Sequence, residues 1–185
     1  IHLKAVYLYN RVSSLGIPIK YSKFFDTITL ECNTQEISKI ALSKNINFCE
    51  LIENQISISV NEKTDLEDLN QIISVFEDYL GQKSNKIDFP NNLMIDNIRK
   101  SEILIHPVFN SYHSETSLMR YIKSLENKDL SLTQSMISLG SCTMKLNAAS
   151  EMIPLSWSEW NSIHPFVPKG QAAGYHKVIS KLETF

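Results

Sequence analysis

The chain has 185 residues, 43% of them apolar, and its 18 basic and 20 acidic residues give a formal net charge of −2. This length and composition suffice for one or two domains with a buried core. The charge balance provides no basic field for nucleic acid or an anionic membrane, and no run of about 18 apolar residues predicts a membrane span.

The cysteines Cys32, Cys49 and Cys142 are widely spaced, without a CxxC pair or a Cys/His cluster of metal-ligand spacing. We therefore expect a reduced, intracellular setting and no metal site. The chain opens at Ile1 in a helical pattern that resembles neither a signal peptide nor a transit peptide. We expect the native amino terminus, and any targeting segment with it, to lie outside these residues.

Residues 1–81 predict a compact α/β unit in the order helix, strand, helix, strand, helix. The two strands are predicted over residues 24–31 and 55–60, where apolar and polar residues alternate as in half-buried strands. The helices are recognised by apolar residues at helical spacing and by their ends. The first helix is expected to end at Gly16, and the second to begin at a capping box formed by Asn33 and Glu36. The third is expected to begin at a capping box formed by Thr64 and Glu67 and to end at Gly81.

The periodicity fades over residues 82–111, which we interpret as an inter-domain connection with a short helix near 93–98. A helix capped by Ser114 is then predicted over residues 115–127. Two further helices are expected, a brief one capped by Ser156 with Glu159 and a last one from about Ala172.

One segment, residues 138–147, gathers hydroxyl, thiol, amine and amide groups around a glycine. That glycine permits a tight turn, and Ser141, Thr143 and Asn147 are suited to orient a carboxylate or phosphate at a helix start. The alternative is a plain helix amino terminus in which Ser141 or Thr143 only caps the next turn. Nothing nearby marks Lys145 as a Schiff-base lysine, and no His and Asp can be assigned to Cys142.

Two other segments carry groups that could bind or react. Residues 163–175 hold two prolines and two glycines around Gln171, in a rigid loop that either presents groups to a ligand or only connects two elements. In residues 112–116, His113 stands near Glu115, but neighbours at a helix start point in different directions. Ser114 acting as a helix cap accounts for most of this second pattern.

These segments resemble glycine decarboxylase, the P-protein of the glycine cleavage system. The resemblance rests on residues 109–116, 120–121, 125–130, 139–148, 151–154, 164–166 and 171–175, which follow one another in the order of that family. Residues 1–81 resemble, more loosely, the small carboxyl-terminal domain of the family's first half.

The resemblance implies an α/β pyridoxal-phosphate-dependent transferase of the aminotransferase-like fold (fold type I), present in part. Residues 1–81 would be the small α/β domain of the first half, 82–111 the linker between halves, and 112–185 a truncated amino-terminal segment of the second half. The junction is continuous here, as in single-chain members. We expect residues from about Asn110 onward to be poorly ordered without the missing part.

The family decarboxylates glycine through a pyridoxal-phosphate aldimine and transfers the aminomethyl group to the lipoyl arm of the H-protein. The resemblance implies pyridoxal phosphate as the cofactor, glycine and H-protein as partners, and a homodimer at full length, with no nucleic-acid or membrane partner. It also implies a cytoplasmic location in a bacterium, which the composition favours, or a mitochondrial one in a eukaryote.

The family's Schiff-base lysine lies downstream in a His-Lys-Thr motif, which this sequence lacks. We therefore assign no catalytic residue, and we expect the chain alone to be inactive. Its predicted contacts to substrate or cofactor are Ser141, Thr143 and Asn147, with Gln171 as a further one. The alternative hypothesis is a stand-alone interaction module that keeps the family's surface without its catalysis.

Overall fold

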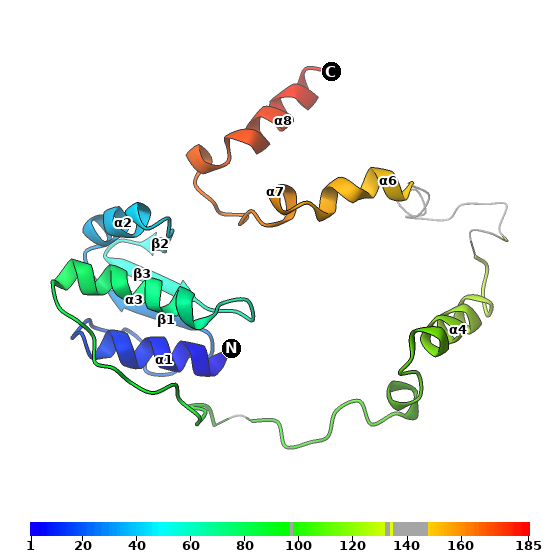
Figure 1. Ribbon diagram of the computed structural model, residues 1–185, viewed down its shortest axis with the longest axis horizontal. Helices are drawn as coiled ribbons and strands as arrows, with labels where there is room; N and C mark the ends of the chain where they lie inside the picture. The colour runs from blue at the N-terminus through cyan, green and yellow to red at the C-terminus, as the bar shows by residue number, and fades with distance from the viewer. Residues whose placement is uncertain (97, 132–133, 135–147) are drawn as a thin grey trace. The chain divides into compact units, whose positions relative to one another are not determined.

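The computed structural model describes residues 1–96, 98–131, 134 and 148–185. It divides the chain into two units, Ile1–Arg99 and Lys100–Phe185 (Figure 1). The first unit is a mixed α/β body, which agrees with the predicted class, whereas the described elements of the second are helical. The assignment of residue ranges to halves of a larger enzyme stays a prediction.

The first unit is built on a three-stranded antiparallel sheet in the order β1-β3-β2. The strands are β1 (Thr27–Glu31), β2 (Cys49–Ile52) and β3 (Gln55–Ser59). β1 and β3 match the two alternating segments, although β1 begins three residues later than predicted. β2 was not predicted, so the expected order of two strands and three helices lacked one element.

The two faces of the sheet differ in chemistry because side chains alternate along each strand. Ile28 lies opposite Ile58 and Leu30 opposite Ile56, and all four are buried. On the other face hydroxyl groups pair across the strands, Thr27 Oγ1 with Ser59 Oγ at 2.7 Å and Thr29 Oγ1 with Ser57 Oγ at 3.2 Å. The predicted division into an apolar and a polar side is therefore confirmed.

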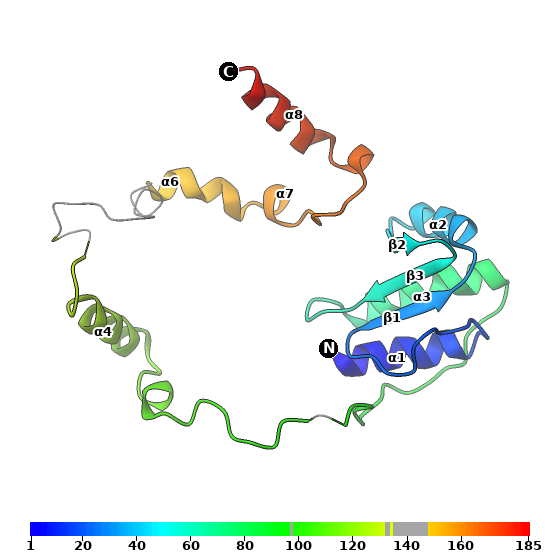
Figure 2. The same cartoon turned by 180° about the vertical axis from the view of Figure 1, so that it is seen from behind.

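The helices α1 (His2–Ser13) and α3 (Leu66–Leu80) pack together on the apolar face, and α2 (Thr34–Ser43) packs against α3. α3 lies in front of the sheet in Figure 1 and behind it in Figure 2. The core between helices and sheet includes the fully buried side chains of Leu8, Val12, Ile28, Leu30, Ile37, Ile56, Leu69, Ile73 and Phe76.

Two predicted helix ends of the first unit, at Asn33 and Gly81, are confirmed, and two are wrong. α1 ends at Ser13 with Ser14 as its C-cap, so Gly16 lies in the turn after the helix and does not end it. The Asn33 side chain accepts from the Glu36 N–H at the start of α2, and Gly81 ends α3 with φ +65°. The capping box of α3, however, is formed by Asp65 and Asp68 instead of Thr64 and Glu67. Thr64 belongs to the preceding turn, where its N–H donates to Asn61 Oδ1, so the first helical residue is Leu66.

The second unit contains separate short elements and two longer helices. Its elements are η1 (Pro107–Asn110), α4 (Glu115–Glu126), α6 (Ala149–Met152), η2 (Ile153–Ser156), α7 (Ser158–Asn161), η3 (Lys169–Gln171) and α8 (Ala173–Glu183). α4 and α8 confirm the two predicted helices. No described helix of the chain is long and apolar enough to cross a membrane.

Two predictions in the later part of the chain are wrong. No helix forms at the described residues 93–96 and 98. Ser156 does not cap α7, because it ends η2 and its hydroxyl donates to the Ile153 carbonyl at 2.7 Å. Trp157 occupies the N-cap position of α7 instead, without a side-chain cap.

Candidate functional site

Gln171 is the one predicted ligand residue that lies among the described residues. Ser141, Thr143 and Asn147 lie outside them, together with Cys142 and Lys145, so their predicted roles stay predictions. Gln171 ends η3, is exposed, and directly precedes the buried Ala172 at the start of α8. Its backbone N–H donates to the Pro168 carbonyl at 2.8 Å, which closes the turn.

The loop that carries Gln171 is tied to α7 by an aromatic pair. The rings of Trp160 and Tyr175 meet edge to face, with centroids 5.2 Å apart and an interplanar angle of 64°. The Tyr175 hydroxyl also donates to the Trp160 carbonyl. Because Tyr175 lies in the first turn of α8, this contact fixes the helix start, and Gln171 just before it, relative to α7.

The same loop is shaped internally by His164. Its Nδ1 accepts from the Phe166 N–H at 3.1 Å, and its carbonyl accepts from the Val167 N–H at 3.0 Å. His164 therefore serves the turn that leads to Pro168. The loop around Gln171 is therefore a defined structure, and both interpretations of this segment, ligand loop and connection, agree with it.

At the start of α4, Ser114 is the helix cap that the sequence predicts. Its hydroxyl accepts from the Ser117 N–H, and the Ser117 hydroxyl accepts from the Ser114 N–H, each at 3.2 Å. No hydrogen bond joins the described side chains of His113 and Glu115. The structure thus supports a capping role for this segment.

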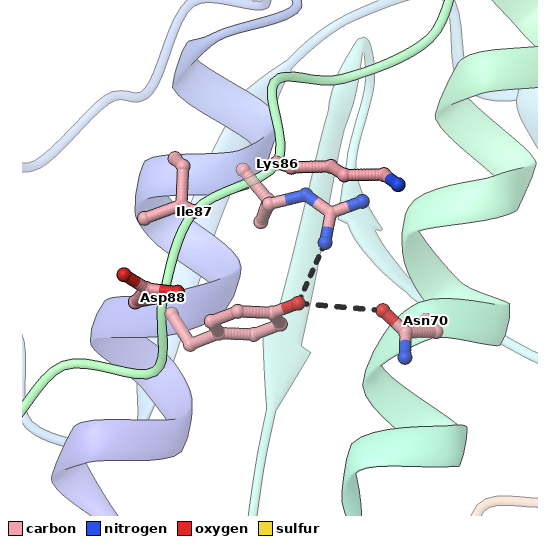
Figure 3. A pocket seen from close by; sticks show the side chains of 6 residues that line it. Asn70, Lys86, Ile87 and Asp88 are labelled. Atoms are coloured by element: carbon pink, nitrogen blue, oxygen red, sulfur yellow. Dashed lines mark hydrogen bonds between the residues drawn. The ribbon is translucent and has the colours of Figure 1, made fainter.

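The first unit has a pocket of about 510 Å³ between α1, α3 and the segment that follows α3 (Figure 3). Its lining residues are Tyr7, Arg11, Asn70, Lys86, Ile87 and Asp88. Arg11 Nη1 donates to the Tyr7 hydroxyl at 2.6 Å, and that hydroxyl donates to Asn70 Oδ1 at 3.4 Å. Sequence reasoning missed this pocket, since its residues come from segments more than sixty positions apart.

The Arg11 side chain in this pocket is already paired with a buried carboxylate. Its Nη2 lies 3.6 Å from Glu77 Oε1, and its Nε donates to Ser84 Oγ at 2.9 Å. Burial raises the pKa of Glu77, but hydrogen bonds from Lys83 and Ser84 outweigh burial and lower it to about 2. Glu77 is therefore ionised at neutral pH and neutralises Arg11, so the pair stabilises the unit and is not an acid–base pair.

The thiol of Cys32 is not activated. Burial, with a smaller effect of the Glu50 charge, raises the pKa of Cys32 to about 11, so its thiol stays protonated at neutral pH. Cys49 is a free, exposed cysteine. Among the described residues no group of three or more His, Cys, Asp or Glu could hold a metal ion.

These features define a mixed α/β protein whose described residues bring together no catalytic set. No family model matches the chain. It is 48% identical over 186 residues to glycine dehydrogenase (decarboxylating) of Flavobacterium johnsoniae, covering 99% of this chain and 20% of the relative. The protein of that name in Christiangramia forsetii is also 48% identical, with the same two shares. Glycine dehydrogenase (decarboxylating) 1 of Colwellia psychrerythraea is 44% identical over 98% of this chain.

The family resemblance found in the sequence is thereby confirmed, and the chain belongs to the glycine dehydrogenase (decarboxylating) family. It spans about one fifth of the length of these relatives, since the matched region covers 20% of each.

Proposed function

We propose that the chain is a working part of a pyridoxal-phosphate-dependent glycine dehydrogenase (decarboxylating) with the aminotransferase-like fold, fold type I. The observation that carries this proposal is the 48% identity to a relative of that name over 99% of this chain. Since the match covers only 20% of the relative, the complete activity requires polypeptide beyond the matched fifth.

The chain's contribution is to bind and orient anionic groups. The hydroxyls of Ser141 and Thr143 and the amides of Asn147 and Gln171 are hydrogen-bond donors suited to the phosphate of the cofactor or the carboxylate of glycine. Pyridoxal phosphate, when bound, supplies the electron sink that decarboxylation needs. The defined loop around Gln171 supports this role, because a fixed loop orients an amide at little entropic cost.

The complete enzyme, in this proposal, passes the aminomethyl group to the lipoyl arm of the H-protein, acts as a homodimer and resides in a bacterial cytoplasm. The Schiff-base lysine comes from polypeptide outside the 185 residues, whose sequence has no His-Lys-Thr motif. Isolated, the chain binds no pyridoxal phosphate covalently and releases no carbon dioxide from glycine.

A chimera tests this proposal. The matching region of the Flavobacterium johnsoniae enzyme is replaced by this chain, and carbon dioxide release from carboxyl-labelled glycine is measured with pyridoxal phosphate and H-protein. The chimera should release labelled carbon dioxide, and the isolated chain should not. A folded chimera that binds the cofactor but releases none would refute the proposal, as would stoichiometric, borohydride-fixed cofactor on the isolated chain.

The second candidate is an interaction module without catalysis. The exposed apolar side chains of α4 and α8 favour it, because they offer a binding surface that needs no cofactor. An inactive chimera, together with tight binding of the chain to a complete glycine dehydrogenase, would support the module over the catalytic part.

A further inference from the structure

The segment that follows α3 runs back along α1 as a strap, residues 82–94, and forms one wall of the first-unit pocket. At one end of the strap, Gln82 Nε2 donates to the Leu15 carbonyl at 3.0 Å. At the other end, the Met94 N–H donates to His2 Nε2 at 3.0 Å. The other two walls are α1 and α3, so every residue that lines the pocket belongs to the first unit. The pocket is therefore defined within that unit alone.

Lys86 of the strap brings a positive charge to the pocket. Its ammonium group has no hydrogen bond or ion pair with any residue that the structure describes. Glu77, in contrast, is shared by two cations, with Oε1 3.6 Å from Arg11 Nη2 and Oε2 2.8 Å from Lys83 Nζ. Asp88 also lines the pocket, but Figure 3 shows Lys86 extending toward α3 and Asp88 lying away from it. The α3 side of the pocket therefore has an excess of positive charge and attracts an anion.

Asn70 of α3 provides a neutral hydrogen-bond donor on that same side. Its Oδ1 accepts from the Tyr7 hydroxyl at 3.4 Å, and that hydroxyl accepts from Arg11 Nη1 at 2.6 Å. Because Oδ1 is bound to Tyr7, the Nδ2 amide group is the part of the side chain that is left to bind a ligand. Nδ2 has no acceptor in the described part of the chain. The pocket thus holds an amide and an ammonium donor without acceptors, and such groups bind carboxylate and phosphate oxygens.

The volume of the pocket, about 510 Å³, lies in the range of about 300–1,000 Å³ that small-molecule sites occupy. A carboxylate or phosphate group alone fills only a small part of it. The rest of the wall is partly apolar, since the Tyr7 ring and the half-buried Ile87 side chain line it. The centroid of the Phe89 ring lies 5.6 Å from that of Tyr7 and supports this wall. The pocket therefore suits an oxyanion that carries a small organic body.

We propose that the first-unit pocket binds a small organic oxyanion, a carboxylate or a phosphate monoester, whose oxygens accept hydrogen bonds from Lys86 Nζ and Asn70 Nδ2. Such a ligand joins the strap to α3, so its binding also stabilises the strap in the closed position. The site goes beyond the proposed function and does not depend on it, since the groups that form it belong to the first unit and act without the cofactor.

The test is an NMR titration of the nitrogen-15-labelled 185-residue chain with sodium acetate and, separately, sodium phosphate at neutral pH, with sodium chloride keeping the ionic strength constant. The backbone amide signals of residues 86–88 report binding. Asn70→Asp keeps an oxygen acceptor and replaces the amide donor with a negative charge. Gln71→Glu is its matched control, because it adds the same charge at the next, exposed position of α3. Lys86→Met removes the ammonium group, and Lys39→Met on α2 is the control for that loss of charge.

The oxyanion site predicts that at least one of the two anions shifts the signals of residues 86–88 along a saturable curve. Asn70→Asp and Lys86→Met should each raise the dissociation constant at least about tenfold, and the two controls should change it by less than about twofold. Saturation by one anion alone supports the site and assigns its class of ligand. Absent or linear shifts with both anions, or equal dissociation constants for Asn70→Asp and Gln71→Glu, would overturn it. If Asn70→Asp loses the dispersed spectrum of the folded parent, the exposed substitution Lys86→Met decides.

Discussion

The carboxylate of Glu77 accepts two hydrogen bonds from Ser84, from its backbone N–H at 3.0 Å and from its hydroxyl at 2.6 Å. Both residues are buried, and the chain between them has passed the left-handed turn at Gly81. Arg11 of α1 reaches the same pair through Ser84 Oγ and Glu77. The contact therefore fastens the segment after α3 to α1 and determines how the chain leaves the first unit.

Replacing Glu77→Gln should lower the free energy of unfolding of the first unit by about 2 kcal/mol, because charge-assisted hydrogen bonds are lost and Arg11 is left without its counter-ion. Glu67→Gln is the matched control, since Glu67 is exposed on the same helix, and it should change the value by less than about 0.5 kcal/mol. Urea-dependent amide exchange of α3 measures the free energy of unfolding of both variants. Equal effects of the two substitutions would contradict the assigned role.

The same carboxylate predicts a pH dependence. The pKa of Glu77 is about 2 in the folded chain, below its usual value of 4.5. A carboxyl group with a lowered folded pKa stabilises the fold above its unfolded pKa, and this contribution is lost as the pH falls toward the folded pKa. The stability difference between the parent and Glu77→Gln should shrink from pH 5 to about pH 2. Parallel stability curves over that range would be the contrary result.

The hydrogen bond between His2 and Met94 predicts how fast the Met94 amide exchanges with solvent. The buried ring of His2 lies with Nδ1 2.7 Å from the Phe25 carbonyl, and its Nε2 accepts from the Met94 N–H at 3.0 Å. Nδ1 must then carry the proton that binds Phe25. His2→Phe should leave the Met94 amide without this acceptor and speed its exchange at least about tenfold, whereas His176→Phe in α8 should not. Unchanged exchange at Met94 would show that this hydrogen bond does not protect the segment.

Gln171 predicts an effect on activity in the chimera. Gln171→Leu removes a hydrogen-bonding amide from the loop before α8, and we expect kcat/KM for glycine to fall by about tenfold. Gln71→Leu, at an exposed position of α3, is the control and should change it by less than about twofold. Far-UV circular dichroism checks that both proteins fold. Equal activities of the two variants would remove Gln171 from the proposed binding groups.

The features that the sequence predicted correctly depend on residues close together in the chain. The alternation in β1 and β3, and the Asn33 and Ser114 caps, depend on residues a few positions apart. β2 escaped prediction because it is short, lacks alternation, and pairs with β3 through an irregular register between Cys49 and Ile52. Thr64 with Glu67 and Asp65 with Asp68 have the same spacing, and only the folded turn selects between them.

The first-unit pocket could not be predicted for a related reason. Arg11 contacts Ser84 across 73 positions of sequence, and no short-range pattern predicts such a pair. The candidate ligand residues, in contrast to the pocket residues, are marked by the sequence but mostly lie outside the described residues. The sequence motif singles them out strongly, but of these residues only Gln171 lies in the part of the chain that the structure describes.

The most direct measurement is the release of labelled carbon dioxide from glycine by the purified chimera, compared with the parent Flavobacterium johnsoniae enzyme under the same conditions. At 48% identity over 99% of this chain, the proposed function predicts a rate within about tenfold of the parent and none from the isolated chain. A chimera that folds and binds pyridoxal phosphate but releases no carbon dioxide above a glycine-free control would contradict the proposed function.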